Sequence, residues 1–172
     1  GFQTANPRSL EWASIRQNRV EKYRDIVATL HRHSFLVTAF LIFGFDTDDT
    51  SIFQVTIDMV KETDMDDAHL YILTPYPGTD MYEQFRREGR LLEGKERTNF
   101  GWANAVFQPK LMTAEELEEG VKRSYEKLHR HFVRQLPGRI IRRLPWLMAN
   151  PGLLYTMVSG GLGRKNIART LD

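Results

Sequence analysis

Apolar residues follow two spacings along this chain, one typical of helices and one typical of buried strands. Arg8–His33 carries apolar positions at roughly helical spacing, with Ser9 as a candidate N-cap, and predicts one long helix. Phe35–Phe43 is an apolar run interrupted by a single threonine, which predicts a strand buried on both faces. Strands of that kind are typical of parallel sheets, so a mixed α/β fold is expected.

The order of strand, loop and helix then repeats. Residues 52–60 place apolar side chains on one helical face, and Ala68–Leu73 predicts a second, shorter strand. A stiff turn at Thr74–Gly78 follows, after which Thr79 is expected to cap a helix that ends at Gly89. The two strands begin about 33 residues apart, which is the spacing of a βαβ unit, so we expect them side by side and parallel.

The C-terminal third of the chain predicts a helical extension. Val106–Pro109 suggests a short strand or arm. Thr113 and Glu116 form a capping box, in which each side chain bonds the other residue's backbone N–H, and they open a helix over residues 114–134. Prolines are expected to cut the chain beyond it into short pieces, at Pro137, Pro145 and Pro151. The predicted domains are residues 1–110, 111–136 and 137–172.

Composition excludes several classes of protein. The chain has 172 residues, 41% of them hydrophobic, and a net charge of +2, so it can form a core and needs no nucleic-acid partner. It has no cysteine, which excludes a disulfide framework, a thiolate nucleophile and a cysteine metal site within the chain. Its five histidines are isolated or spaced two apart, so no metal site is predicted. The start has no signal-peptide pattern and no initiator methionine, which predicts a cytoplasmic location and a truncated beginning.

Charge divides the chain unevenly. Residues 1–133 contain 17 Lys and Arg against 21 Asp and Glu, whereas residues 134–172 contain 7 against 1. The second part therefore carries a net charge of +6 and the first −4. Apolar and basic residues adjoin one another in it, namely Arg139, Arg142 and Arg143 beside Ile140, Ile141 and Trp146. This tail predicts either peripheral contact with an anionic membrane or packing against another part of the same protein.

An acidic loop follows the first strand. Asp46, Asp48 and Thr50 stand in an Asp-x-Asp-x-Thr pattern that resembles the nucleophile motif of haloacid-dehalogenase-type phosphatases, with Asp46 as nucleophile. The alternative is structural, because Asp48, Asp49 or Thr50 could accept the unpaired N–H groups at the beginning of the next helix. We favour the structural interpretation, since the later acidic pair of that family is not in its place.

Five short segments, taken in order, resemble the radical S-adenosylmethionine (radical SAM) enzymes. Within that superfamily the chain looks most like the branch that carries an N-terminal cobalamin-binding domain. The resemblance extends over roughly residues 1–135, and residues 102–135 are similar to the C-terminal extension of many of those proteins. The segments are Gly1–Asn6, Arg16–Arg19, Phe40–Asp46, Ile72–Thr79 and Glu88–Leu92.

The resemblance implies the C-terminal part of a partial (β/α)6 barrel of the TIM type, followed by a mostly helical extension. Gly1–Thr4 would end strand four, Phe35–Phe43 would be strand five and Ala68–Leu73 strand six. It also implies that the intact enzyme cleaves S-adenosylmethionine with a [4Fe-4S] cluster whose ligands lie outside this chain, forming a 5′-deoxyadenosyl radical. A cobalamin domain, also outside the chain, would direct this chemistry to the methylation of a small or lipid-like substrate.

The resemblance implies a binding site for S-adenosylmethionine but no catalytic residue in this part of the enzyme. Gln3 stands where the family often has a glutamate near the ribose. Ile42 would pack on the adenine, and Gly44 would let the backbone approach the ligand. Leu73 and Thr74 fall where the family's backbone meets the adenine edge. Core packing is the alternative role for Ile42 and Leu73. A non-catalytic interaction module is the alternative for the whole chain.

Overall fold

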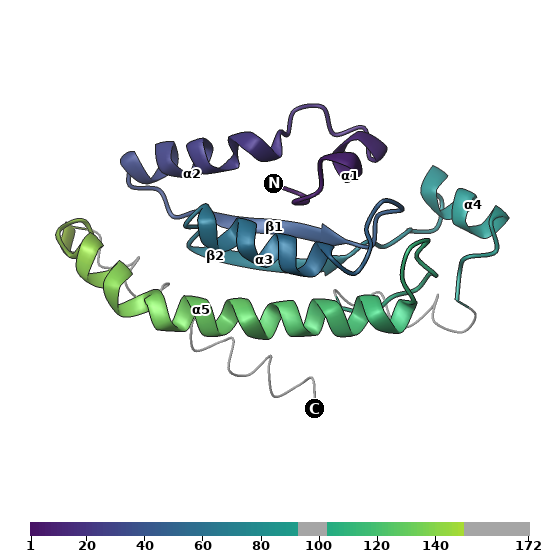
Figure 1. Ribbon diagram of the computed structural model, residues 1–172. Helices are drawn as coiled ribbons and strands as arrows, with labels where there is room; N and C mark the ends of the chain where they lie inside the picture. The colour runs from purple at the N-terminus through teal and green to yellow at the C-terminus, as the bar shows by residue number, and fades with distance from the viewer. Residues whose placement is uncertain (93–102, 150–172) are drawn as a thin grey trace. The chain divides into compact units, whose positions relative to one another are not determined.

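The computed structural model describes residues 1–92 and 103–149 (Figure 1). The chain divides into two compact units, Gly1–Glu126 and Lys127–Asp172. The first unit is a mixed α/β structure with a two-stranded parallel sheet. In chain order the elements are α1 Pro7–Trp12, the 3-10 helix η1 Val20–Lys22, α2 Tyr23–Arg32, β1 Thr38–Phe43, α3 Ile52–Glu62, β2 Asp67–Ile72, α4 Asp80–Arg87 and α5 Ala114–Ala149.

The parallel pairing predicted for the two strands is confirmed. β1 and β2 run side by side in the same direction, with Thr38 opposite Asp67 and Phe43 opposite Ile72 (Figure 1). α3 connects the end of one strand to the beginning of the other, as in a βαβ unit. β1 begins at Thr38, three residues later than predicted, whereas β2 has the predicted length but begins and ends one residue earlier, at Asp67 and Ile72.

The segment before α1 adds a parallel bridge on the other side of β1. The backbone N–H of Gln3 donates to the carbonyl of Phe40 at 3.0 Å, and the carbonyl of Gln3 accepts from the N–H of Ile42 at 2.6 Å. Gln3 thus pairs with Leu41 and lies at the C-terminal half of β1.

The two faces of the sheet have different surroundings. We call one the covered face; its residues are all buried, namely Ala39, Leu41, Phe43, Ala68, Leu70 and Ile72. We call the other the open face; its residues are half-buried or exposed, namely Phe40, Ile42, His69 and Tyr71. The prediction of a strand buried on both faces is therefore wrong for the described part of the chain. Alternate side chains of a strand point to opposite faces, and only one face meets a packed layer.

Helices α3 and α5 meet at the covered face. The ring of Phe53 in α3 lies 5.5 Å from that of Phe43, measured between centroids. A side chain at Gly120 of α5 would come within 2.1 Å of the Phe53 ring, so this glycine lets the ring pack on the helix backbone. The described beginning of α5 is in this way part of the core of the first unit.

The single helix predicted over Arg8–His33 is wrong, because the chain turns between α1 and α2. Ser14 has a φ of +55°, a left-handed conformation that no helix interior accepts. The side chain of Asn18 donates to the carbonyls of Gly1 and Phe2, which holds the turn against the N-terminal segment. The N-cap of α1 is Asn6 and not the predicted Ser9.

The helix boundaries predicted at Thr79, Gly89 and Thr113 are confirmed. Thr79 Oγ1 accepts from the N–H of Tyr82 at 3.2 Å, and Gly89 follows α4 with a φ of +65°. The N–H of Thr113 donates to Glu116 Oε2 at 2.7 Å, while the N–H of Glu116 donates back to Thr113 Oγ1 at 3.1 Å. This reciprocal pair is the predicted capping box.

Helix α5 is longer than predicted. It continues beyond residue 134 to Ala149, so Pro137 and Pro145 do not break it. Each proline removes only one backbone N–H, and the leucines and arginines around them are strong helix formers. The predicted tail beyond residue 149, with Pro151, lies outside the described residues. Within the described residues, no helix is both long and apolar enough to cross a membrane.

Candidate functional site

The residues proposed to hold adenosine lie on neighbouring strand ends. The N–H of Ile42 donates to the backbone carbonyl of Gln3 at 2.6 Å, and the N–H of Leu73 donates to the carbonyl of Phe43 at 2.8 Å. These backbone bonds place Gln3, the end of β1 and the end of β2 along one edge of the sheet. Ligands of parallel α/β folds bind at this edge. The structure thus brings the predicted residues together, and their contact with a ligand stays a prediction.

Gln3 carries its amide close to the N-terminal residue. It has a φ of +69°, which is uncommon for a residue other than glycine. A side chain built at Gly1 would lie 2.7 Å from Gln3 Nε2 and 3.7 Å from Phe40 Cβ. The Gln3 amide and the Phe40 side chain therefore both border Gly1.

Leu73 and Thr74 have fewer groups to offer than predicted. Leu73 is buried, and its backbone N–H already bonds the end of β1. The Thr74 hydroxyl donates to the carbonyl of Ile72 at 3.1 Å, which holds this side chain against its own strand. Packing explains Leu73, and only the half-buried Thr74 presents surface at the edge.

Gly44 is required for packing. It has a φ of +96°, and a Cβ there would lie 2.9 Å from Leu117 Cδ2 and 3.3 Å from Phe107 Cζ. Its N–H donates to Asp48 Oδ2 at 3.2 Å, so this donor is used within the loop. The sequence interpretation gave the glycine a role in ligand approach, whereas the structure gives it a role in receiving α5.

Aromatic rings gather on the open face, and the sequence interpretation missed them. The rings of Phe40 and His69 are 5.1 Å apart with 19° between their planes, and those of Phe40 and Tyr71 are 6.0 Å apart with 11°. The signal was present in the alternation of the strands, because Phe40 and Ile42, like His69 and Tyr71, are two residues apart. The exposure of Phe40 cannot be predicted from the run Phe35–Phe43, because a continuous apolar run predicts burial on both faces of the strand.

The carboxylate of Asp48 organises the loop after β1. Its Oδ2 accepts from the N–H groups of Gly44 and Phe45, both at 3.2 Å. Its Oδ1 accepts from Ser9 Oγ at 2.6 Å and from Asn6 Nδ2 at 3.0 Å. Burial raises the pKa of Asp48, and these hydrogen bonds oppose that rise. Asp48 thereby ties α1 to the loop.

The predicted capping of α3 by the acidic loop is wrong in its details. The N-cap of α3 is Ser51, whose side chain makes no capping bond. Asp49 Oδ1 accepts from the hydroxyl of Ser51 at 2.5 Å and from its N–H at 2.8 Å, one residue before the helix begins, and these two bonds lower the pKa of Asp49. The loop acids therefore satisfy loop donors instead of the first turn of the helix.

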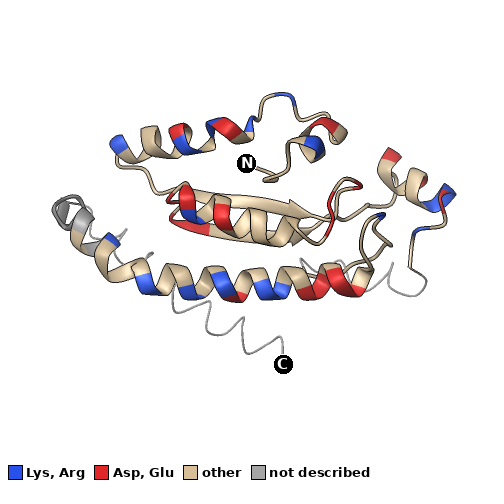
Figure 2. Cartoon of the chain, in the orientation of Figure 1, with Lys and Arg blue, Asp and Glu red and all other residues tan. Residues whose placement is uncertain are grey.

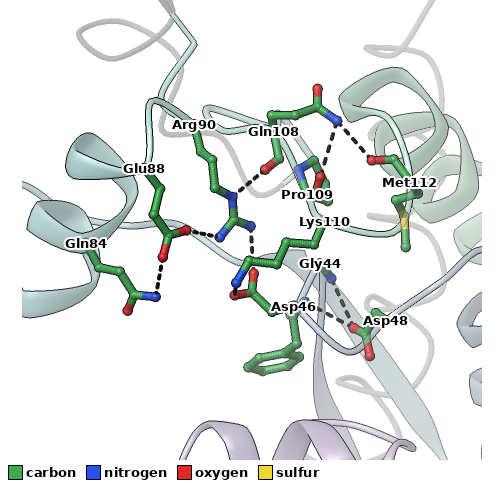
Figure 3. Close-up of polar contacts among 11 residues, drawn as sticks. Gly44, Asp46, Asp48, Gln84, Glu88, Arg90, Gln108, Pro109, Lys110 and Met112 are labelled. Atoms are coloured by element: carbon green, nitrogen blue, oxygen red, sulfur yellow. Dashed lines mark hydrogen bonds and ion pairs between the residues drawn. The ribbon is translucent and has the colours of Figure 1, made fainter.

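A buried ion-pair network holds Asp46 (Figure 3). Arg90 Nη2 lies 2.6 Å from Asp46 Oδ1, and Lys110 Nζ lies 2.8 Å from Asp46 Oδ2. The side chains of Asp46 and Arg90 are only 5% and 10% exposed. Arg90 also bonds Glu88 at 2.9 Å and the carbonyl of Gln108 at 2.8 Å.

Aromatic packing completes the surroundings of Arg90. Its guanidinium carbon lies 4.0 Å from the centre of the Phe85 ring and 5.7 Å from that of Phe107. Phe107 makes only an isolated antiparallel bridge with Leu91, so the short strand expected at Val106–Pro109 is an arm. The network therefore joins α4, this arm and the loop after β1.

These contacts disfavour the phosphatase interpretation. A carboxylate nucleophile has to reach the phosphorus atom of a substrate. Asp46 has one oxygen on Arg90 and the other on Lys110, and it is buried. Asp48, the second acid of the pattern, is engaged by four donors of the loop and α1. Both acids have structural roles.

The cofactors implied by the resemblance differ in how they fit this chain. A [4Fe-4S] cluster needs thiolate ligands, and the chain has no cysteine. Among the described residues there is also no group of three or more His, Asp or Glu that could hold a metal ion. An adenosine fits better, because half-buried Ile42 offers an apolar side chain on the open face, and Gln3, which pairs with the same strand, carries a polar amide.

The first unit is thus a mixed α/β structure built on a two-stranded parallel sheet. No protein-family model matches the chain. It is 30% identical over 119 residues to the bacteriochlorophyllide d C-12(1)-methyltransferase of Chlorobaculum tepidum, covering 69% of this chain and 25% of that protein. It is 27% identical over 125 residues to an uncharacterised methyltransferase of Pyrococcus horikoshii, covering 73% and 27%.

A third relative has a different name. The chain is 30% identical over 86 residues to the tRNA-2-methylthio-N(6)-dimethylallyladenosine synthase of Deinococcus radiodurans, covering 49% of this chain and 17% of that protein. The chain thus spans about a quarter of the length of the two methyltransferases and less of the synthase. These relatives support an enzyme.

Proposed function

We propose that this chain is the C-terminal part of the barrel of a radical SAM methyltransferase, and that its open face holds the adenosine of S-adenosylmethionine. The observation that carries the proposal is the backbone pairing of Gln3 with the C-terminal half of β1, where the carbonyl of Gln3 accepts from the N–H of Ile42. Similarity to two methyltransferases supports the methyl-transfer chemistry. The motif order from Gly1 to Leu92 supports the radical SAM class.

The open face supports a barrel. Parallel sheets are nearly always covered on both faces, because their connections put packed layers there. Here the open face is apolar and aromatic, and Phe40 is 47% exposed. Further strands of a longer protein would curve this face inward and enclose it. The partner of this surface would then be the N-terminal part of the same protein.

The proposed roles follow from the side chains at the edge. Ile42 would pack on the flat adenine, and the Gln3 amide would exchange hydrogen bonds with a ribose hydroxyl. Asp48 and Gly44 would act indirectly, since they fix the loop after β1. S-adenosylmethionine bound here would supply the 5′-deoxyadenosyl radical, with an electron from the cluster and methionine as the leaving group, and the methyl group would come from a second molecule of S-adenosylmethionine. The [4Fe-4S] cluster and any cobalamin would be held by residues outside this chain.

The aromatic rings of the open face suggest the kind of substrate. Phe40, His69 and Tyr71 stand nearly parallel, so flat conjugated rings or an apolar lipid-like body could pack against them. A flat ring system suits stacked aromatic side chains better. The first relative is named for such a substrate, a bacteriochlorophyllide.

Binding of S-adenosylmethionine to the longer protein tests the proposal. Calorimetry should show that Gln3→Ala and Ile42→Ala each raise the Kd about tenfold, for the loss of one hydrogen bond or of apolar contact. Thr38→Ala is the matched control, because Thr38 lies on the same strand and face at its opposite end. Wild-type affinity in both folded variants would overturn the proposed site. A longer gene product without a cysteine triplet would overturn the radical SAM class.

A further inference from the structure

Helix α5 changes its electrostatic character along its length. Residues 114–126 contain five Glu and two Lys or Arg, whereas residues 127–149 contain six Lys or Arg and no acidic residue. Figure 2, which colours the ribbon by residue type, shows acidic residues at the beginning of α5 and basic residues further along. The change coincides with the division between the two compact units, after Glu126. The basic half therefore belongs to the second unit.

One face of this basic half is exposed and carries both charge and apolar surface. Arg130 and Arg134 are exposed, and so are Val133 at 49% and Ile141 at 71%. Positions three, four and seven apart share one side of a helix. We call these four residues the cationic stripe. Val133 and Ile141 thus add exposed apolar surface beside the two arginines.

Arg139 does not belong to the stripe. Its guanidinium lies 5.6 Å from the Phe132 ring, and its Nε donates to Gln135 Oε1 at 3.2 Å. Arg139 is buried, so we do not count it among the residues of the stripe. Ile141, also named for membrane contact, is exposed. The side chains of the others lie outside the described part of the chain, namely Ile140, Arg142, Arg143 and Trp146.

We propose that residues 127–149 lie flat on an anionic lipid bilayer, with Arg130 and Arg134 at the headgroups and Val133 and Ile141 entering the acyl boundary. Charge complementarity argues for this occupant, because the segment has six cations and no acid to oppose them. The apolar members of the stripe argue for lipid over a purely polyanionic partner. At 1.5 Å per residue the segment is about 34 Å long, and it would bind along the surface. This inference is independent of the proposed enzymatic activity.

Flotation with lipid vesicles tests the proposal on the 172-residue chain. Vesicles of phosphatidylcholine alone are compared with vesicles that also contain about 30% phosphatidylglycerol, at about 100 mM salt. The chain should bind the anionic vesicles and not the neutral ones. Arg130→Gln with Arg134→Gln should lower the partition coefficient about 25-fold, at about fivefold per cation. Ile141→Asp should also lower it.

The control removes two exposed cations from the first unit. Arg32→Gln with Lys61→Gln changes the net charge equally and should leave binding within about twofold. Far-UV circular dichroism of each variant establishes that α5 is still formed. The proposal is overturned if wild type does not float with anionic vesicles, or if the control variant loses as much binding as the stripe variant. Self-association that depends on Arg130 and Arg134 without lipid binding would also overturn it, in favour of a protein interface.

Discussion

The covered and open faces of the β1–β2 sheet are built from similar residues, yet they have different surroundings. Phe43 on the covered face is 1% exposed, and Phe40, three residues earlier on the open face, is 47% exposed. α3, the beginning of α5 and the arm around Phe107 pack against the first face or its loop. The open face has aromatic side chains in contact with one another instead. The difference teaches that apolar character alone does not separate a core from an exposed surface.

The largest expected effect tests this comparison with one residue type. Phe43→Ala should lower the free energy of unfolding by about 3–5 kcal/mol, because it opens a cavity between β1 and α3. Phe40→Ala should cost less than about 1 kcal/mol in this chain, since its ring is largely in solvent. Urea denaturation of both variants measures the two values. Equal losses would mean that the open face is part of the core after all.

The longer protein offers a sharper form of the same test. If further strands enclose the open face, Phe40→Ala should cost distinctly more there than in the 172-residue chain. An unchanged small cost in the longer protein would contradict the proposed barrel.

The second effect concerns the ion pair that holds the arm in place. Arg90→Gln should lower the free energy of unfolding by roughly 3 kcal/mol, because it leaves the buried carboxylate of Asp46 without its closest cation. Arg86→Gln is the matched control; Arg86 pairs with Glu83 on the exposed side of α4 and should contribute less than about 1 kcal/mol. A loss for Arg90→Gln no larger than that of the control would show that the arm does not depend on this pair.

The third effect separates backbone strain from packing at the end of β1. Gly44→Ala should cost about 2–3 kcal/mol, since the residue has a positive φ and the new methyl group would meet Leu117. Gly78→Ala should cost only about 1 kcal/mol, because Gly78 has a φ of +86° but open space around it. Thermal unfolding measures the loss in free energy of unfolding for each variant, and the difference between the two losses is the contribution of packing at Gly44. No difference would mean that α5 does not pack on the loop.

The smallest effect compares two acids of the same loop through their pH dependence. Burial raises the pKa of Asp48, so the folded chain binds this proton more tightly than the unfolded chain does. The stability due to Asp48 is therefore present at low pH and lost as the pH rises through the raised pKa. Lowering the pH from about 7 to about 4 should stabilise wild type relative to Asp48→Asn.

Asp49 is the control with the opposite sign. Hydrogen bonds from Ser51 lower the pKa of Asp49, so its contribution is present at neutral pH and lost as the pH falls. Wild type should therefore lose stability relative to Asp49→Asn over the same range. Urea denaturation at four pH values measures how the stability difference between wild type and each variant changes with pH. Changes of the same sign for Asp48→Asn and Asp49→Asn would contradict the assigned burial of Asp48.

Local rules account for the parts of the structure that the sequence predicted well. Thr79, Gly89 and the Thr113–Glu116 box act within a few residues of themselves, so their roles can be read from spacing. The parallel pair follows from two apolar runs separated by a helical pattern. Contacts between distant residues explain the failures. The turn after α1 depends on Asn18 reaching Gly1, and Asp46 meets Arg90 from 44 positions away.

The sequence by itself determined the order of strands and helices, the strand-end edge where Gln3 and Ile42 lie, and the basic character of the C-terminal region, because each rests on local spacing or composition. Only the tertiary structure decided that one face of β1 is buried and the other open, that Gly44 makes room for Leu117, and that Asp46 is an ion-paired acid instead of a nucleophile. These features depend on which distant side chains meet. An apolar or acidic residue has the same letter in the sequence whether or not a partner covers it.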